Sequence, residues 1–168
     1  MKTKKKESIG VIATRHYIIA GFVSPSVIGI LIGMLFFALF GAETTSNLIS
    51  LYSDFGIFLQ ISTTLIFTLL ITMPGFYFGT LWSTDIIRKR YEILNRNKIV
   101  NLSAKIYFFV AFILLILDIS LSVLSNSLQV GHVTISPTEL TSFFLSIFAV
   151  FIGATLFYLI TQKYFLVS

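Results

Sequence analysis

Cysteine is absent from this sequence, so no disulfide bond and no thiolate metal site can form within the chain. Charge is also scarce, because only 11% of the residues are charged whereas 56% are hydrophobic, and the mean hydropathy is +0.93. These values lie outside the usual range of soluble domains. The 168 residues therefore predict a single membrane domain, with no room for a separate soluble catalytic domain.

The 12 Lys and Arg residues are confined to three places along the chain. They precede the first of four apolar stretches, lie between the second and the third, and follow the fourth. The other two connections carry Glu43, Asp54 and Glu139 but no Lys or Arg. Because the cytoplasmic loops of membrane proteins are enriched in Lys and Arg, this pattern places both termini and the middle loop in the cytoplasm.

The four apolar stretches predict an all-α integral membrane four-helix bundle that occupies residues 1–168. The predicted spans are 17–42, 55–84, 105–125 and 139–162. The predicted cytoplasmic basic loop is 85–105. The first stretch is far longer than the about 7–15 apolar residues of a signal peptide, so we expect a span that is not cleaved. Pro74 predicts a kink in the second span, and Pro137 predicts the first turn of the fourth.

Two segments of the sequence, 8–16 and 85–105, combine basic and apolar residues. Residues 8–16 mix apolar side chains with Arg15 and His16, which predicts a short interfacial lead-in to the first span. Within 85–105, Ile87, Tyr91 and Leu94 recur at helical spacing among basic residues. This segment is either an amphipathic helix on an anionic membrane surface or a solvated basic loop. The predicted lipid-headgroup contacts are Lys4, Lys5, Lys6, Arg88, Lys89 and Arg90.

Small residues recur at helical spacing in three of the predicted spans, where they would let helix backbones approach closely. They include a Gly-x-x-x-Gly motif in the first span, and the same spacing in the second. They predict contacts within the bundle or with another chain. The predicted packing residues are Gly21, Gly29, Gly33, Gly75, Gly79, Ala149 and Gly153.

Asp118 is the acidic residue that falls inside a predicted span, and a carboxyl group is costly there. It lies at a depth of about 12 Å from the outer end of its span, at about 1.5 Å per residue. Gln60, Thr64 and Ser146 fall near the same level, so we predict an intramembrane polar layer. The layer either fixes helix register through hydrogen bonds, or Asp118 binds and releases a proton or a cation.

Reactive centres find little support in the sequence. His16 and His132 fall on opposite sides of the predicted membrane, so they cannot jointly hold a haem or a metal ion within one chain. No histidine is expected at membrane depth to activate a serine, and no glycine-rich phosphate loop is present. We therefore expect no catalytic residue, no metal and no cofactor bound by this chain alone, apart from lipid. Topology accounts for the basic balance, so nucleic acid is not an expected partner.

These observations predict a noncatalytic multi-pass subunit that stabilises a larger membrane complex, with an energy-transducing or respiratory complex as one candidate. Its partners would be other integral membrane subunits and lipids, in the plasma membrane of a prokaryote. The first alternative is a small homo-oligomeric transporter or channel that uses Asp118 and the threonines of the second span. The second alternative is a membrane enzyme that handles a lipid or a quinone.

Overall fold

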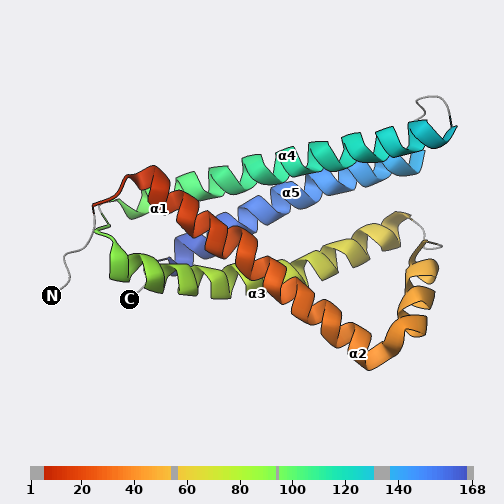
Figure 1. Ribbon diagram of the computed structural model, residues 1–168, viewed down its shortest axis with the longest axis horizontal. Helices are drawn as coiled ribbons and strands as arrows, with labels where there is room; N and C mark the ends of the chain where they lie inside the picture. Colours follow the sequence, from red (N-terminus) through yellow and green to blue (C-terminus); the bar gives the residue numbers. More distant parts are fainter. Residues whose placement is uncertain (1–5, 54–56, 94, 131–136, 166–168) are drawn as a thin grey trace.

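The computed structural model describes residues 6–53, 57–93, 95–130 and 137–165. It is 93% helical, and no strand occurs in those ranges, which confirms the predicted all-α class. The elements in chain order (Figure 1) are α1 (Ile9–His16), the π-helix η1 (Tyr17–Val23), α2 (Ser24–Ser53), α3 (Ile57–Arg90), α4 (Arg96–Val130) and α5 (Pro137–Tyr164).

The first helical stretch begins before the predicted span. α1, η1 and α2 follow one another without a gap, and Ser8 caps α1 by accepting a hydrogen bond from the backbone nitrogen of Val11 at 3.4 Å. Ile12 and Ala13 are buried against other helices. The segment is thus a helix whose apolar face packs against protein, and its place at a membrane interface stays a prediction.

A kink at Gly41 interrupts α2. Gly41 has φ 73° and ψ 172°, a conformation that glycine adopts readily and residues with a side chain rarely adopt. The kink lies beside Ala42, where the first span was predicted to end. The helix axis therefore changes direction at a residue that carries no Cβ.

The basic segment at 85–105 is largely helical. α3 continues to Arg90 and α4 begins at Arg96, so most of this segment extends two long helices. Asn95 caps α4, since its Oδ1 accepts a hydrogen bond from the backbone nitrogen of Lys98 at 3.1 Å. The described part of the segment therefore contains no long loop, and its place on a membrane surface stays a prediction.

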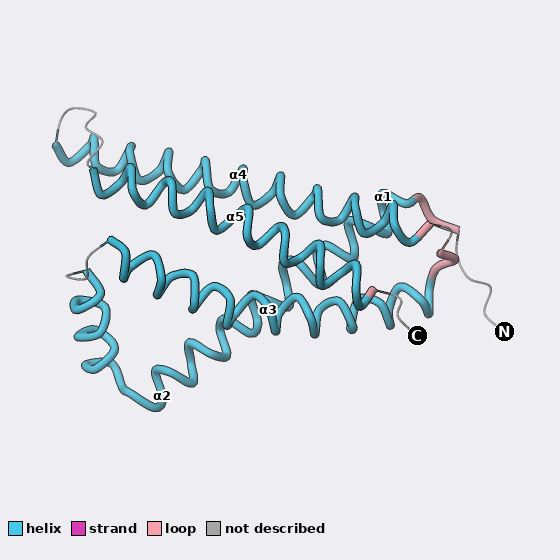
Figure 2. The backbone as a smooth tube through the Cα atoms, turned by 180° about the vertical axis from the view of Figure 1, so that it is seen from behind, coloured by secondary structure: helices cyan, strands magenta, loops and turns pink. Residues whose placement is uncertain are grey.

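The helices converge at the end of the molecule where α1 begins and α5 ends, and they diverge toward the other end (Figures 1 and 2). α4 and α5 stay side by side, whereas α2 departs from α3. The buried hydrophobic clusters lie where the helices converge, and we call this region the packed end. They are formed by Ile12, Ala13, Ile87, Tyr91, Ile99, Val100 and Phe165, and by Ala20, Phe76 and Phe157.

Three helical stretches among the described residues are long and apolar enough to cross a membrane. They are Ile9–Gly41, Arg96–Ser125 and Phe143–Tyr164, and each overlaps a predicted span. The predicted span at 55–84 overlaps α3 but begins outside the described residues, so it stays a prediction. The side chains on the outer faces of these stretches are mostly large and apolar, as contact with lipid requires.

Candidate functional site

A buried histidine joins three helices at the packed end. His16, the last residue of α1, has an exposed fraction of 0%. Its Nδ1 lies 2.6 Å from Oγ of Ser83 on α3, and its Nε2 lies 3.3 Å from Oγ1 of Thr161 on α5. Ser83 and Thr161 are also fully buried. A polar centre therefore stands inside an otherwise apolar packing region.

Both ring nitrogens of this imidazole have a hydroxyl partner. The Ser83 hydroxyl lies 2.6 Å from Nδ1 of His16 and 3.0 Å from the carbonyl oxygen of Thr80, so its single hydrogen can be directed to either. In a neutral imidazole one nitrogen donates and the other accepts, and the hydroxyls of Ser83 and Thr161 can serve as acceptor or donor for either tautomer. Both ring nitrogens are thus satisfied without a charged partner, as burial requires.

Aromatic rings close the surroundings of the polar centre. Phe157 stacks on the His16 ring with centroids 5.7 Å apart, and Phe165 lies at 4.5 Å. Tyr107 stacks in turn on Phe157 at 5.2 Å, and Phe76 meets both of those rings edge-on. These contacts exclude water, which strengthens the hydrogen bonds of the imidazole.

The spacing of the residues explains how the helices deliver this site. On α1, His16 follows Ile12 and Ala13 at intervals of four and three residues, so all three share one face. Phe157 and Thr161 on α5 and Phe165 in the turn directly after it recur every four residues. Each helix therefore presents a buried stripe of apolar side chains with one or more polar groups in it.

Two further hydroxyls are buried on α3 without a hydrogen-bond partner. They belong to Thr80, whose exposed fraction is 0%, and Thr84, at 7%. Threonine in a helix often donates to the carbonyl oxygen four residues earlier, as Thr72 does to Thr68 at 2.6 Å. Thr80 and Thr84 make no such bond, and each carries a desolvation cost of about 1–3 kcal/mol.

The geometry around His16 favours a structural role over a catalytic one. The 2.6 Å approach of Nδ1 to Ser83 matches the distance between a base and a nucleophile. However, His16 and Ser83 are both fully buried, so a substrate cannot reach them, and the Ser83 hydroxyl also lies 3.0 Å from the carbonyl oxygen of Thr80. The part of the chain that the structure describes contains no group of three or more His, Cys, Asp or Glu residues placed to hold a metal ion.

The sequence did not predict this site. It placed His16 at the membrane surface, whereas the structure buries it between α1, α3 and α5. The available signal was the helical spacing of Ile12, Ala13 and His16 on one face of a segment that also carries Arg15. The identity of the partners depends on contacts between residues far apart in the sequence, which periodicity does not provide.

The two members of the predicted polar layer whose side chains are described, Asp118 and Ser146, do not belong to this centre. Asp118 is exposed on α4, and Ser146 is half-buried on α5. The side chains of Gln60 and Thr64 lie outside the described residues, so the layer itself stays a prediction. The apolar side chains Leu114, Leu117 and Leu121 around Asp118 are also exposed.

The predicted packing glycines differ in their surroundings. A Cβ added to Gly75 would lie 2.6 Å from Cα of Pro25, and one added to Gly79 would lie 2.7 Å from Cα of Ala20. One added to Gly153 would lie 2.7 Å from the Tyr107 hydroxyl. The remaining positions are Gly21, in close contact with Tyr17 and Tyr107; Gly29, 3.3 Å from Ile71; Ala149, half-buried; and Gly33, with nothing within 4 Å.

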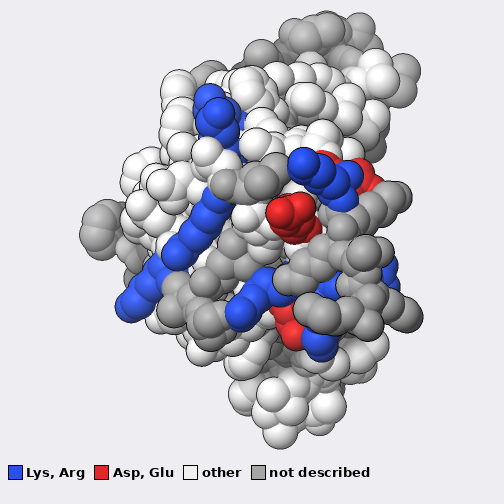
Figure 3. Space-filling model, turned by 90° about the vertical axis from the view of Figure 1, so that its left-hand side faces the viewer, with Lys and Arg blue, Asp and Glu red and all other residues white. Residues whose placement is uncertain are grey.

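The basic side chains gather over the packed end (Figure 3). Of the predicted headgroup contacts, Lys4 and Lys5 lie outside the described residues, and the others are exposed. Lys89 forms an ion pair with Asp85 at 2.6 Å. Both side chains are largely exposed, so this pair contributes at most about 1 kcal/mol to stability.

No family model, curated protein or solved structure matches this chain. The interpretation of the site therefore depends on its own geometry.

Proposed function

We propose that this chain is a noncatalytic multi-pass subunit of a larger membrane assembly, in which it packs against other integral membrane subunits. The observation that supports this proposal is the exposure of Asp118 on an apolar surface of α4. Insertion scales give a cost of about 2.5–3.5 kcal/mol for an aspartate at the centre of a membrane helix. A polar group on a neighbouring chain would offset that cost.

The neighbours of Asp118 on α4 extend the same surface. Ser122 and Ser125 follow it by one and two helical turns, and all three side chains are exposed. Hydroxyl and carboxyl groups on one face can form hydrogen bonds with a second helix inside the membrane. We propose that this stripe contacts a partner subunit in a four-span topology, with both termini in the cytoplasm of a prokaryotic cell.

Cross-linking from α4 tests the proposed contact. A photoreactive amino acid replaces Leu114, which lies one turn from Asp118, or Ile116, which lies on roughly the opposite side of the helix at about 100° per residue. The two positions are a matched pair, because Leu114 is 52% exposed and Ile116 is 48% exposed. We expect irradiation of native membranes to yield a protein adduct from Leu114 and little or none from Ile116.

The composition of the adduct decides between two functions. Mass spectrometry should identify a different membrane protein, and Asp118→Leu should abolish its capture while leaving the amount of the chain unchanged. An absorption spectrum of the co-purified complex would show whether that partner carries haem or flavin. Adducts of the chain with itself alone would overturn the subunit proposal and favour the homo-oligomeric transporter, for which an Asp118→Asn flux assay in liposomes is the next test.

A further inference from the structure

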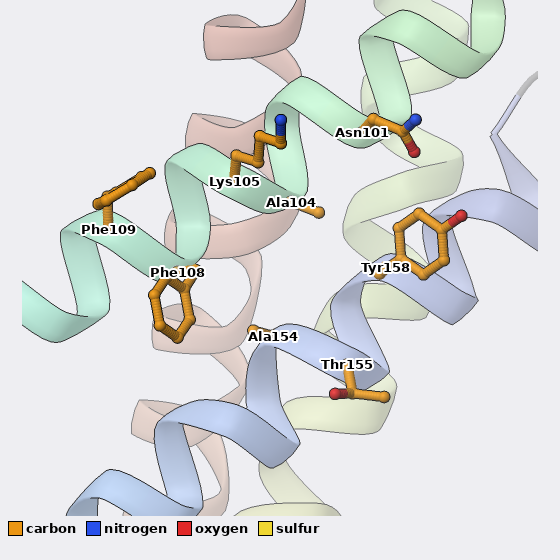
Figure 4. A pocket seen from close by; sticks show the side chains of 8 residues that line it. All are labelled: Asn101, Ala104, Lys105, Phe108, Phe109, Ala154, Thr155 and Tyr158. Carbon is orange, nitrogen blue, oxygen red and sulfur yellow. The ribbon is translucent and has the colours of Figure 1, made fainter.

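A groove between α4 and α5 has the chemistry of a binding site for one anionic phospholipid. Its volume is about 420 Å³. The side chains that line it (Figure 4) are Asn101, Ala104, Lys105, Phe108, Phe109, Ala154, Thr155 and Tyr158.

The groove is amphipathic along its length. Asn101 and Tyr158 lie toward one end in Figure 4, and Phe108 and Phe109 lie toward the other, with Lys105 between them. Lys105 and Phe109 are one turn apart on α4, a rise of about 6 Å along the helix. A molecule with a polar head and an apolar chain can therefore meet matching surfaces at both ends.

A positive charge lies beside the polar end of the groove. Lys105 is exposed, and no acidic side chain is among the residues that line the groove. Lys89, by contrast, already pairs with Asp85. The Lys105 ammonium, the Asn101 amide and the Tyr158 hydroxyl can all donate hydrogen bonds, which suits phosphate oxygens. Basic pockets between membrane helices on the cytoplasmic side commonly bind anionic headgroups.

The apolar end offers space for an acyl chain. Ala104 and Ala154 are small residues on facing helices, and both are half-buried. The rings of Phe108 and Phe109 provide apolar walls beside this hollow, and Phe108 is itself packed at 5.3 Å from the Phe151 ring. Larger side chains at the two alanines would fill the space between the helices.

We propose that this groove binds an anionic phospholipid, with its phosphate at Lys105, Asn101 and Tyr158 and an acyl chain along Phe108 and Ala154. The inference rests on the proposed membrane location of the chain and is independent of the partner subunit. It therefore adds a specific lipid site to the general headgroup contacts of the basic residues.

Native mass spectrometry of the purified full chain, stripped of lipid in detergent, tests the proposal. Phosphatidylglycerol and phosphatidylcholine with identical acyl chains are added in equal amounts. We expect phosphatidylglycerol to bind about fivefold more tightly, the effect of about one Lys beside an anionic lipid. Lys105→Gln should reduce that preference to about one, whereas Lys98→Gln should retain it, because Lys98 is exposed on α4 but does not line the groove.

A second variant separates the acyl site from the charge. Ala104→Leu should weaken binding of both lipids without changing their ratio, because it fills the groove and leaves Lys105 in place. Equal binding of the two lipids to the unmodified chain, or an unchanged preference in Lys105→Gln, would overturn the proposal. Displacement of phosphatidylglycerol by millimolar inorganic phosphate would also overturn it, because the site would then bind a free anion. Partners are absent from this assay, so its result is independent of the cross-linking result.

Discussion

At the residue scale, His16 fixes the relative positions of α1, α3 and α5. A buried imidazole needs a partner at each nitrogen, and here the partners come from two different helices. Sliding or rotating any one of the three helices would break a hydrogen bond between fully buried groups. The Arg15 guanidinium adds a second contact from α1, 5.0 Å from the centre of the Tyr91 ring. Polar and cationic groups thus define the position of α1, because hydrophobic contacts alone would allow it more than one orientation.

Replacing Ser83 with alanine tests this role of the imidazole. The change removes the hydrogen-bond partner of Nδ1 of His16, so we expect a loss of about 1–3 kcal/mol in the free energy of unfolding. Denaturant titration in detergent micelles measures the loss. Ser26→Ala is the control, because the Ser26 hydroxyl is exposed and bonds only to the carbonyl oxygen of Phe22, at 2.7 Å. It should change stability by less than about 0.5 kcal/mol.

A double-mutant cycle distinguishes a hydrogen bond from simple packing. In the background of His16→Phe, the additional change Ser83→Ala should cost much less than it does alone, since no buried ring nitrogen is then left without a partner. Equal costs in the two backgrounds would show that Ser83 acts through its volume and not through His16.

At the element scale, small residues determine how η1 and α2 pack on α3. The contact positions rise in number along η1 and α2 while they fall along α3, so the two helical segments pack antiparallel. The contacts are Ala20 and Ser24 with Gly79, Pro25 with Gly75, and Gly29 with Ile71. Backbones come this close in a membrane because dispersion contacts replace the hydrophobic effect as the force between helices. We call this row of contacts the seam. It begins at Ala20, one helical turn after His16, so it holds the polar centre in place.

Gly79→Ala should destabilise the chain, because its Cβ would lie 2.7 Å from both Cα of Ala20 and Cβ of Ser24. We expect a cost of about 1–3 kcal/mol, typical of overpacking, in thermal unfolding followed by circular dichroism. Gly33→Ala provides the control, because its Cβ would meet nothing within 4 Å. That change should be neutral or stabilising by up to about 1 kcal/mol, as helix propensity predicts. Equal destabilisation by both changes would contradict the seam.

The sequence predicted the small-residue spacing at the seam but could not identify its contacts. Periodicity shows that Gly75 and Gly79 share a face of one helix, and it carries no information about the helix opposite. The same limit applies at 8–16 and 85–105. Their basic residues predict a membrane surface, and the structure adds that Arg15 and Arg90 lie on helices whose other faces are buried, at Ala13 and Ile87. Long amphipathic helix ends that pack on each other produce the same local pattern as a surface helix.

At the scale of the whole molecule, polar burial and positive charge coincide at one end. The buried hydroxyls of Thr80, Ser83, Thr84, Ser103 and Thr161 belong to the packed end, as His16 does. The sequence instead predicted polar contacts in the outer half, because Asp118 is the more costly group to place in a membrane. A hydroxyl carries little cost when it bonds within its own helix, as Ser103 does to the carbonyl oxygen of Val100 at 2.9 Å. Its burial is therefore hard to read from composition.

The distribution of Lys and Arg gives the last prediction, which concerns orientation. Because the sequence contains no cysteine, any single cysteine introduced into it can be labelled without background. Lys98, exposed at the start of α4 in the packed end, should lie on the cytoplasmic side, and His132, in the predicted outer connection, should lie outside. Lys98→Cys should therefore react with a membrane-impermeant maleimide only in inside-out vesicles, and His132→Cys only in intact cells.

Reaction of both variants from the same side would contradict four spans, because α4 must cross the membrane once between these two positions. Reaction of each variant from the opposite side would leave the spans intact and reverse the orientation, which would show that the basic end does not obey the charge bias of membrane insertion.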